Sequence, residues 1–91
     1  MVEQLKKVLT VLEDEIKNGD SVWSKQQLLS VVKPEIEELY QYFVSGKLFF
    51  KYGKKQRMLE STYIITESLK KLKDTNLGRE IIKLQELYYK L

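Results

Sequence analysis

Apolar residues recur every three or four positions at both ends of the chain. Near the start they are Val2, Leu5, Leu9, Leu12 and Ile16, and near the end Leu77, Ile81, Leu84, Tyr88 and Leu91. Because an α-helix turns once in 3.6 residues, each set falls on one face of a helix. The pattern therefore predicts two amphipathic helices that bury these faces against the rest of the chain.

Local signals predict where these helices begin and end. Asn18-Gly19-Asp20 tolerates turn geometry and ends the first helix. Ser24-Lys25-Gln26-Gln27 has the form of a capping box, so a second helix begins there. Asp74, Thr75 or Asn76 can cap the last helix, because each side chain accepts a hydrogen bond from a first-turn amide.

Pro34 predicts a break in the middle of the first half. Proline lacks an amide hydrogen and restricts the residue before it, so it either kinks a long helix or begins a new one. We expect a new helix or a sharp kink, with Glu35, Glu37 and Glu38 at the positive end of the helix dipole. Ser45-Gly46 ends this helix.

The stretch 47–66 permits two interpretations. Leu48 to Tyr52 has strand propensity and lies between two glycines, so a β-hairpin over 47–66 behind three helices would give an α+β, winged-helix-like fold. The spacing of Met58, Thr62, Ile65, Leu69 and Leu72 instead favours a helix within residues 56–71. We expect the helix and keep the hairpin as the alternative.

The whole chain is thus predicted to be all-α, a small antiparallel bundle of four to five helices in a single domain over residues 1–91. Short inferred loops make consecutive helices antiparallel neighbours. The predicted core is formed by Leu5, Leu9, Leu12, Ile16, Leu28, Ile36, Leu39, Phe43, Ile65, Leu69, Leu77, Ile81, Leu84 and Tyr88.

The residue types that are missing argue against an enzyme. With no His and no Cys, the chain lacks the usual general base, zinc ligands and nucleophile arrangements. Its four glycines are isolated and form no phosphate-binding loop. Positions on polar helix faces or in a first turn explain the acidic groups 13–15 and 35–38, so we expect no metal, cofactor or small-molecule substrate.

Charge and hydropathy bear on location and partners. Charges interrupt every apolar stretch, so no membrane span or signal-peptide core can be drawn, and the lack of Cys fits a reducing cytoplasm. Residues 1–45 carry a net charge of −3 and residues 46–91 a net charge of +6. This polarity either brings acidic and basic faces together within the domain or marks a basic surface for an acidic partner.

A basic, aromatic segment is the first candidate binding site. Residues 46–57 hold five cations, three aromatic residues and no acid. Such a segment can pack its apolar side chains against the end of the bundle while the lysines stay in solvent. It can also bind nucleic acid by phosphate contact and base stacking. Binding to an anionic membrane surface is a third, less favoured alternative. Its candidate residues are Lys47, Phe49, Lys51, Tyr52, Lys54, Lys55 and Arg57.

Two pairs of closely spaced tyrosines form the second candidate. Tyr40 with Tyr42 and Tyr88 with Tyr89 lie on two helices that we expect to be neighbours, and one tyrosine of each pair must face away from the core. Exposed aromatic residues are enriched at protein interfaces. Tyr42 and Tyr89 are therefore candidates for a protein-binding or dimer surface, against the simpler interpretation of ordinary partial burial.

These features together predict a small non-catalytic accessory or regulatory protein that binds another protein or itself. In size and class the chain is similar to small helical immunity and inhibitor proteins of bacteria, an analogy that rests on no shared motif. The alternative is a nucleic-acid-binding regulator, with a helix-turn-helix in 24–45 and a basic wing in 47–57. The glutamates at the start of its recognition helix weigh against that alternative.

Overall fold

The regular elements of the computed structural model are all helical in the residues that it describes, which are 1–18, 22–45, 58–68 and 71–90. They are α1 (Val2–Asn18), α2 (Lys25–Gln27), a π-helical turn (Leu28–Val32), α3 (Lys33–Val44), α4 (Glu60–Glu67) and α5 (Asn76–Tyr89). The all-α prediction is confirmed. The hairpin alternative is wrong for its second strand, because Glu60 to Thr66 is helical, and its first part lies outside the described residues.

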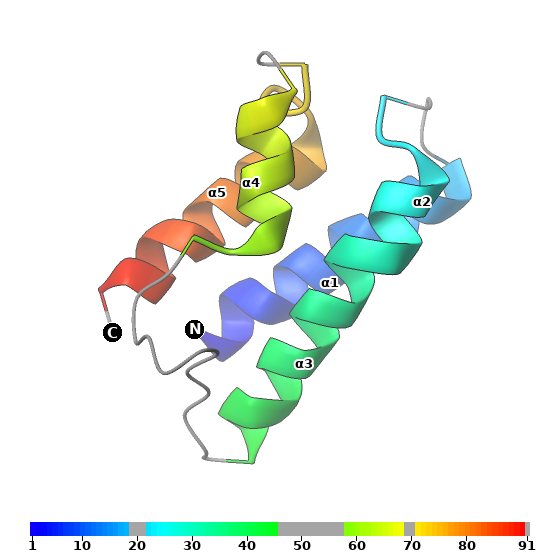
Figure 1. The fold of residues 1–91 in the computed structure, drawn as a ribbon. Coiled ribbons are helices and arrows are strands. Elements are labelled where there is room, and N and C mark those ends of the chain that lie inside the picture. The colour runs from blue at the N-terminus through cyan, green and yellow to red at the C-terminus, as the bar shows by residue number, and fades with distance from the viewer. Residues whose placement is uncertain (19–21, 46–57, 69–70, 91) are drawn as a thin grey trace.

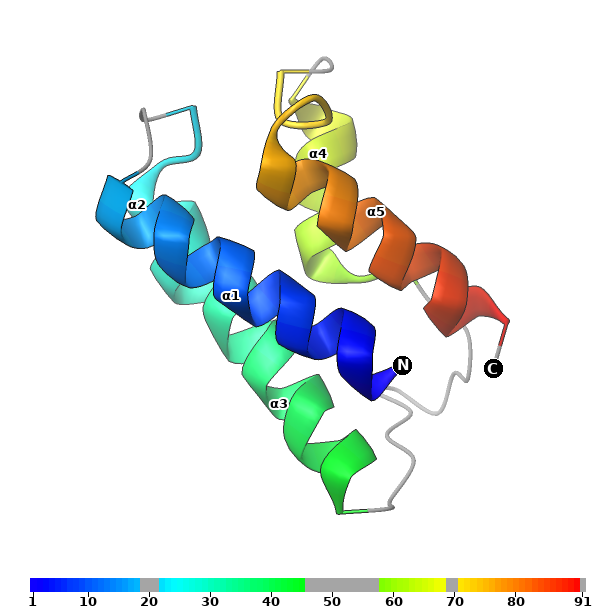
Figure 2. The same ribbon diagram turned by 180° about the vertical axis from the view of Figure 1, so that it is seen from behind.

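Helix α1 is the element around which the others are arranged. It packs against α3 on one side and α5 on the other, and Figure 2 shows it between these two helices. Helix α4 packs against α5 and also meets the π-helical turn (Figure 1). The tyrosine pairs lie on α3 and α5, which we expected to be neighbours. These two helices are instead connected through α1, on which both pack.

The helical run from α2 through α3 continues past Pro34. Ser24 begins it with the predicted capping box, in which its hydroxyl accepts from the Gln27 amide and the Gln27 side chain accepts from the Ser24 amide. The π-helical turn ends at Val32, two residues before the proline, and the Lys33 amide donates to the Leu28 carbonyl, five residues back. A wider turn gives room to the proline ring, so the predicted break becomes a local change of helical winding.

The core joins the π-helical turn with α1, α3, α4 and α5, and the predicted core residues agree with it in most positions. Leu9, Ile16 and Phe43 are only partly buried, though they pack against it, and Leu69 lies outside the described residues. The fully enclosed apolar residues are Leu5, Val8, Leu12, Trp23, Leu28, Val32, Ile36, Leu39, Leu59, Ile65, Leu72, Leu77, Ile81, Leu84 and Tyr88.

A carboxylate of α3 caps the start of α4. Glu35 is only 9% exposed, and its two oxygens accept from the Glu60 amide at 2.8 Å and from the Ser61 amide at 2.8 Å and hydroxyl at 2.7 Å. On α5, Gln85 accepts from the Leu59 amide at 2.7 Å. The amides at a helix N-terminus have no partner within the helix, so side chains of α3 and α5 supply the partners that α4 needs.

Replacing Glu35 with Ala is expected to lower the free energy of unfolding by about 3 kcal/mol, because the Glu60 amide and the buried amide and hydroxyl of Ser61 lose a charged acceptor. Glu37→Ala is the matched control, since Glu37 is an exposed glutamate of the same helix, and it should change stability by less than about 0.5 kcal/mol. Chemical denaturation followed by circular dichroism measures both. Equal effects of the two variants would contradict the capping role.

The start of α5 is fixed by the hydroxyl of Thr75. This hydroxyl donates to the Leu72 carbonyl at 2.6 Å and accepts from the Gly78 amide at 2.9 Å and from the Trp23 indole at 3.0 Å. One donor and two acceptor positions are all that a hydroxyl has, so its capacity is filled. Trp23, which is 2% exposed, thereby ties the segment before α2 to the cap of α5.

Gly78→Ala is expected to destabilise the protein by about 2 kcal/mol, because an added Cβ would lie 1.9 Å from the Leu72 carbonyl oxygen and 2.9 Å from the Thr75 hydroxyl. The direction of this change in stability is informative, because replacing Gly with Ala within a helix normally stabilises a protein by about 0.5–1 kcal/mol. Glu86→Ala, at an exposed position of the same helix, is the control. Thermal and chemical unfolding test it, and a gain in stability would show that the cap tolerates a side chain.

Candidate binding surface

A small apolar groove lies between α4 and α5. It has a volume of about 320 Å³, and the described residues that line it are Thr62, Ile65 and Thr66 of α4, Lys73 of the turn before α5, and Ile82 of α5. Thr62 and Thr66 are four residues apart and so share one edge of α4. The groove therefore forms where the edges of two packed helices meet, and its walls are mostly apolar.

Thr62 brings an unusual polar group to this groove. The residue is 7% exposed, and its side-chain oxygen is buried with no hydrogen-bond partner among the described residues. Leaving a buried hydroxyl without a partner costs about 1–3 kcal/mol, so native proteins rarely keep one. Because the oxygen is enclosed, the hydroxyl is a cost to the packing of α4 and is not a group that the groove exposes.

Exposed apolar side chains lie on the same helices as the groove. Tyr89 is 42% exposed and lies seven residues after Ile82, which places both on one edge of α5. Tyr63, which is 58% exposed, lies on α4, and Met58, 45% exposed, lies just before it. An apolar groove with large exposed side chains nearby is a typical feature of protein-binding surfaces.

The residues proposed from the sequence are distributed unevenly over the structure. Lys47, Phe49, Lys51, Tyr52, Lys54, Lys55 and Arg57 lie outside the described residues. Tyr42 is half-buried on α3, and Tyr89 is exposed on α5, so α1 lies between the helices that carry them. Tyr89 shares an edge of α5 with the groove residue Ile82, whereas Tyr42 lies on α3, on the other side of α1 (Figure 2).

Thr62, Lys73 and Ile82 are groove residues that the sequence analysis did not select. The spacing of Ile82 and Tyr89 is a signal that was present, because residues seven apart share a helix face. No local pattern shows that Thr62 loses its hydrogen-bond partners, since that depends on how α4 packs against α5.

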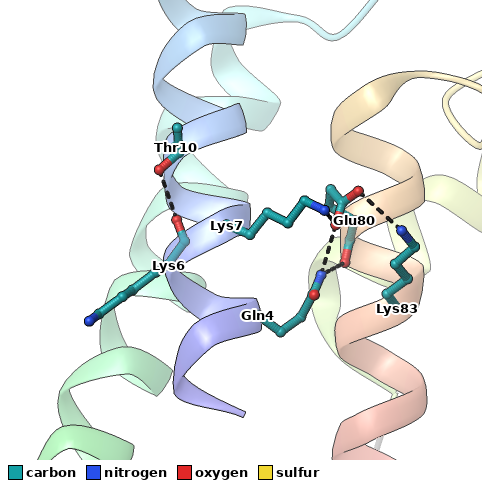
Figure 3. Close-up of polar contacts among 6 residues, drawn as sticks. All are labelled: Gln4, Lys6, Lys7, Thr10, Glu80 and Lys83. Atoms are coloured by element: carbon teal, nitrogen blue, oxygen red, sulfur yellow. Dashed lines mark hydrogen bonds and ion pairs between the residues drawn. The ribbon is translucent and has the colours of Figure 1, made fainter.

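A second polar cluster joins α1 to α5 around Glu80 (Figure 3). Gln4 donates to the Glu80 carbonyl at 2.9 Å and to its carboxylate at 3.1 Å, while Lys7 and Lys83 approach that carboxylate at 3.7 and 3.5 Å. The Gln4 hydrogen bond is the main cause that lowers the pKa of Glu80 from 4.5, against the opposing effect of burial, and the two lysine charges add to it. A carboxylate held in its ionised form suits a structural junction better than proton transfer.

The described residues contain no group of three or more acidic, His or Cys side chains placed to hold a metal ion. A polar depression of about 370 Å³ between the end of α1 and the start of α5 combines acidic side chains with Arg79. Among the described helices, none combines the length and the apolar character that a bilayer crossing requires.

Comparisons of the chain with models of protein families, with curated proteins and with solved structures give no match in any of the three.

The stability that Glu80 contributes is expected to depend on pH. Because its pKa in the folded protein lies below the ordinary value of 4.5, the ionised carboxylate stabilises the fold above that value, and this contribution is lost as the pH falls through the lowered pKa. The difference in unfolding free energy between the wild type and Glu80→Gln should therefore shrink from pH 6 to pH 3. Urea denaturation at both pH values measures it, and a constant difference would contradict the assignment.

Proposed function

We propose that this chain is a small non-catalytic accessory or regulatory protein that acts by binding another protein in the cytoplasm. The observation that carries the proposal is the α4–α5 groove with Tyr89 exposed on the same edge of α5 as Ile82. Aromatic and aliphatic side chains at a partly open groove are the usual anchors of protein interfaces. The sequence supports the non-catalytic part, because it has no His and no Cys.

The nucleic-acid alternative is supported by the sequence alone. Its basic residues belong to the segment 47–57, outside the described residues, and the winged-helix fold that would present them is not found in residues 58–66. Glu35, at the start of the proposed recognition helix, is occupied in capping α4. The protein-binding function is therefore the one that the geometry favours.

Site-specific photocrosslinking in the cells that produce the protein tests the proposal. The photoreactive residue p-benzoylphenylalanine replaces Tyr89, and irradiation is expected to give one discrete protein adduct, since the new side chain projects from the same edge of α5. Adducts are identified by mass spectrometry before and after nuclease treatment. An adduct that nuclease removes would favour the nucleic-acid alternative.

Leu87 provides the matched control position. It lies on the same helix with a similar exposed fraction, 38% against 42%, but two residues earlier, so that it projects from a different side of α5. The same photoreactive residue at position 87 should give little or none of the adduct. Equal adducts at both positions, or none at position 89, would contradict a binding surface at the groove edge.

A further inference from the structure

We infer that the α4–α5 groove receives an aliphatic side chain from a helix of the partner protein, with a carboxylate one turn away on that helix. The inference rests on the proposed function and adds the chemistry of the partner. It is carried by two observations on the groove: its volume with apolar walls, and Lys73, the charged side chain among the described residues that line it.

The size of the groove favours a side chain of a partner polypeptide over a free small molecule. Its volume of about 320 Å³ is at the lower limit of ligand pockets, which are roughly 300–1,000 Å³ and enclose most of the ligand surface. The groove is partly open, and its walls include the half-buried Ile82 beside the buried Ile65. A helix that lies across two packed helices places one or two apolar anchors in such a groove.

The charge of the groove favours an acidic neighbour for that anchor. Lys73 is the only charged side chain among the described residues that line it, and no described carboxylate pairs with Lys73. An opposite charge on the partner gains both attraction and orientation there, while a cation is repelled. Glu or Asp one helical turn from the anchor is within reach of the flexible lysine side chain.

The Thr62 oxygen is enclosed, so a helix that lies on the groove does not reach it. Among the described residues, the groove therefore offers a partner an apolar wall and one positive side chain.

The test selects partners from a library of helical peptides displayed on a stable scaffold, with positions i, i+3, i+4 and i+7 of one helix randomised. Selected helices are expected to carry Leu, Ile, Val or Met with Asp or Glu one turn away. Their dissociation constants should rise at least tenfold for Ile82→Asp and for Lys73→Glu. A second selection against Lys73→Glu should exchange the acid for Lys or Arg.

Two control variants match these changes in charge and location. Leu87→Asp adds an acid to another side of α5, and Lys71→Glu reverses a charge in the turn before α5 at a residue that lines a separate depression with Val22. Both should bind the selected helices within about twofold of the wild type. Losses equal to those of the groove variants would show that net charge or folding, and not the groove, decides binding.

Thr62→Val separates binding from folding. It replaces an unpaired buried hydroxyl with a methyl group of the same shape, so the urea midpoint should stay level or rise. Because the hydroxyl is enclosed, the same variant should bind the selected helices within about twofold of the wild type. A larger loss would show that binding depends on the packing of α4 and not on the groove wall itself.

The remaining outcomes overturn the inference in distinguishable ways. Selected helices without an acid, or no enrichment over the empty scaffold, would show that the groove does not recognise this chemistry. Sedimentation that shows a wild-type dimer and a monomeric Ile82→Asp variant would make a second copy the occupant. If the photoreactive residue at position 89 still gives its adduct in the Ile82→Asp and Lys73→Glu backgrounds, the proposed function stands and the groove assignment fails. If it gives no adduct in the otherwise wild-type protein, both fail.

Discussion

The short helix α4 depends on side chains that the rest of the fold brings to it. A helix of eight residues is marginal in water, because nucleation costs more than so few hydrogen bonds return. Glu35 of α3 and Gln85 of α5 accept from three successive amides at its start, Leu59, Glu60 and Ser61. Since α4 forms one wall of the groove, the candidate binding surface exists only when α3 and α5 are both in place.

The sequence predicted the parts of the fold that follow from local signals. The end of α1, the capping box at Ser24 and the start of α5 at Thr75 were all expected, because each is set by residues within one turn. The continuation of the helix past Pro34 and the first and last residues of α4 were less well predicted. Both depend on packing between segments far apart in the chain, as the contact of Glu35 with Ser61 shows.

The candidate site was harder to predict than the fold. An exposed position for Tyr89 follows from adjacent tyrosines on an amphipathic helix, because two neighbours cannot both face the core. The groove requires the relative placement of α4 and α5, which no single segment encodes. The charge asymmetry between the two halves was also a poor guide, since the ion pair at Glu80 takes Lys7 from the acidic half and Glu80 from the basic half.

The unpaired hydroxyl of Thr62 is a cost to the stability of the helix that forms one wall of the groove. If α4 were selected for stability alone, valine at this position would fill the same space without a buried polar atom. The neighbouring helix ends show that this chain does satisfy buried polar groups, since the Thr75 hydroxyl uses all its capacity and Glu35 accepts three hydrogen bonds. The enclosed Thr62 hydroxyl is an exception that lowers the stability of α4, so the side chains that hold the start of this helix have to offset its cost.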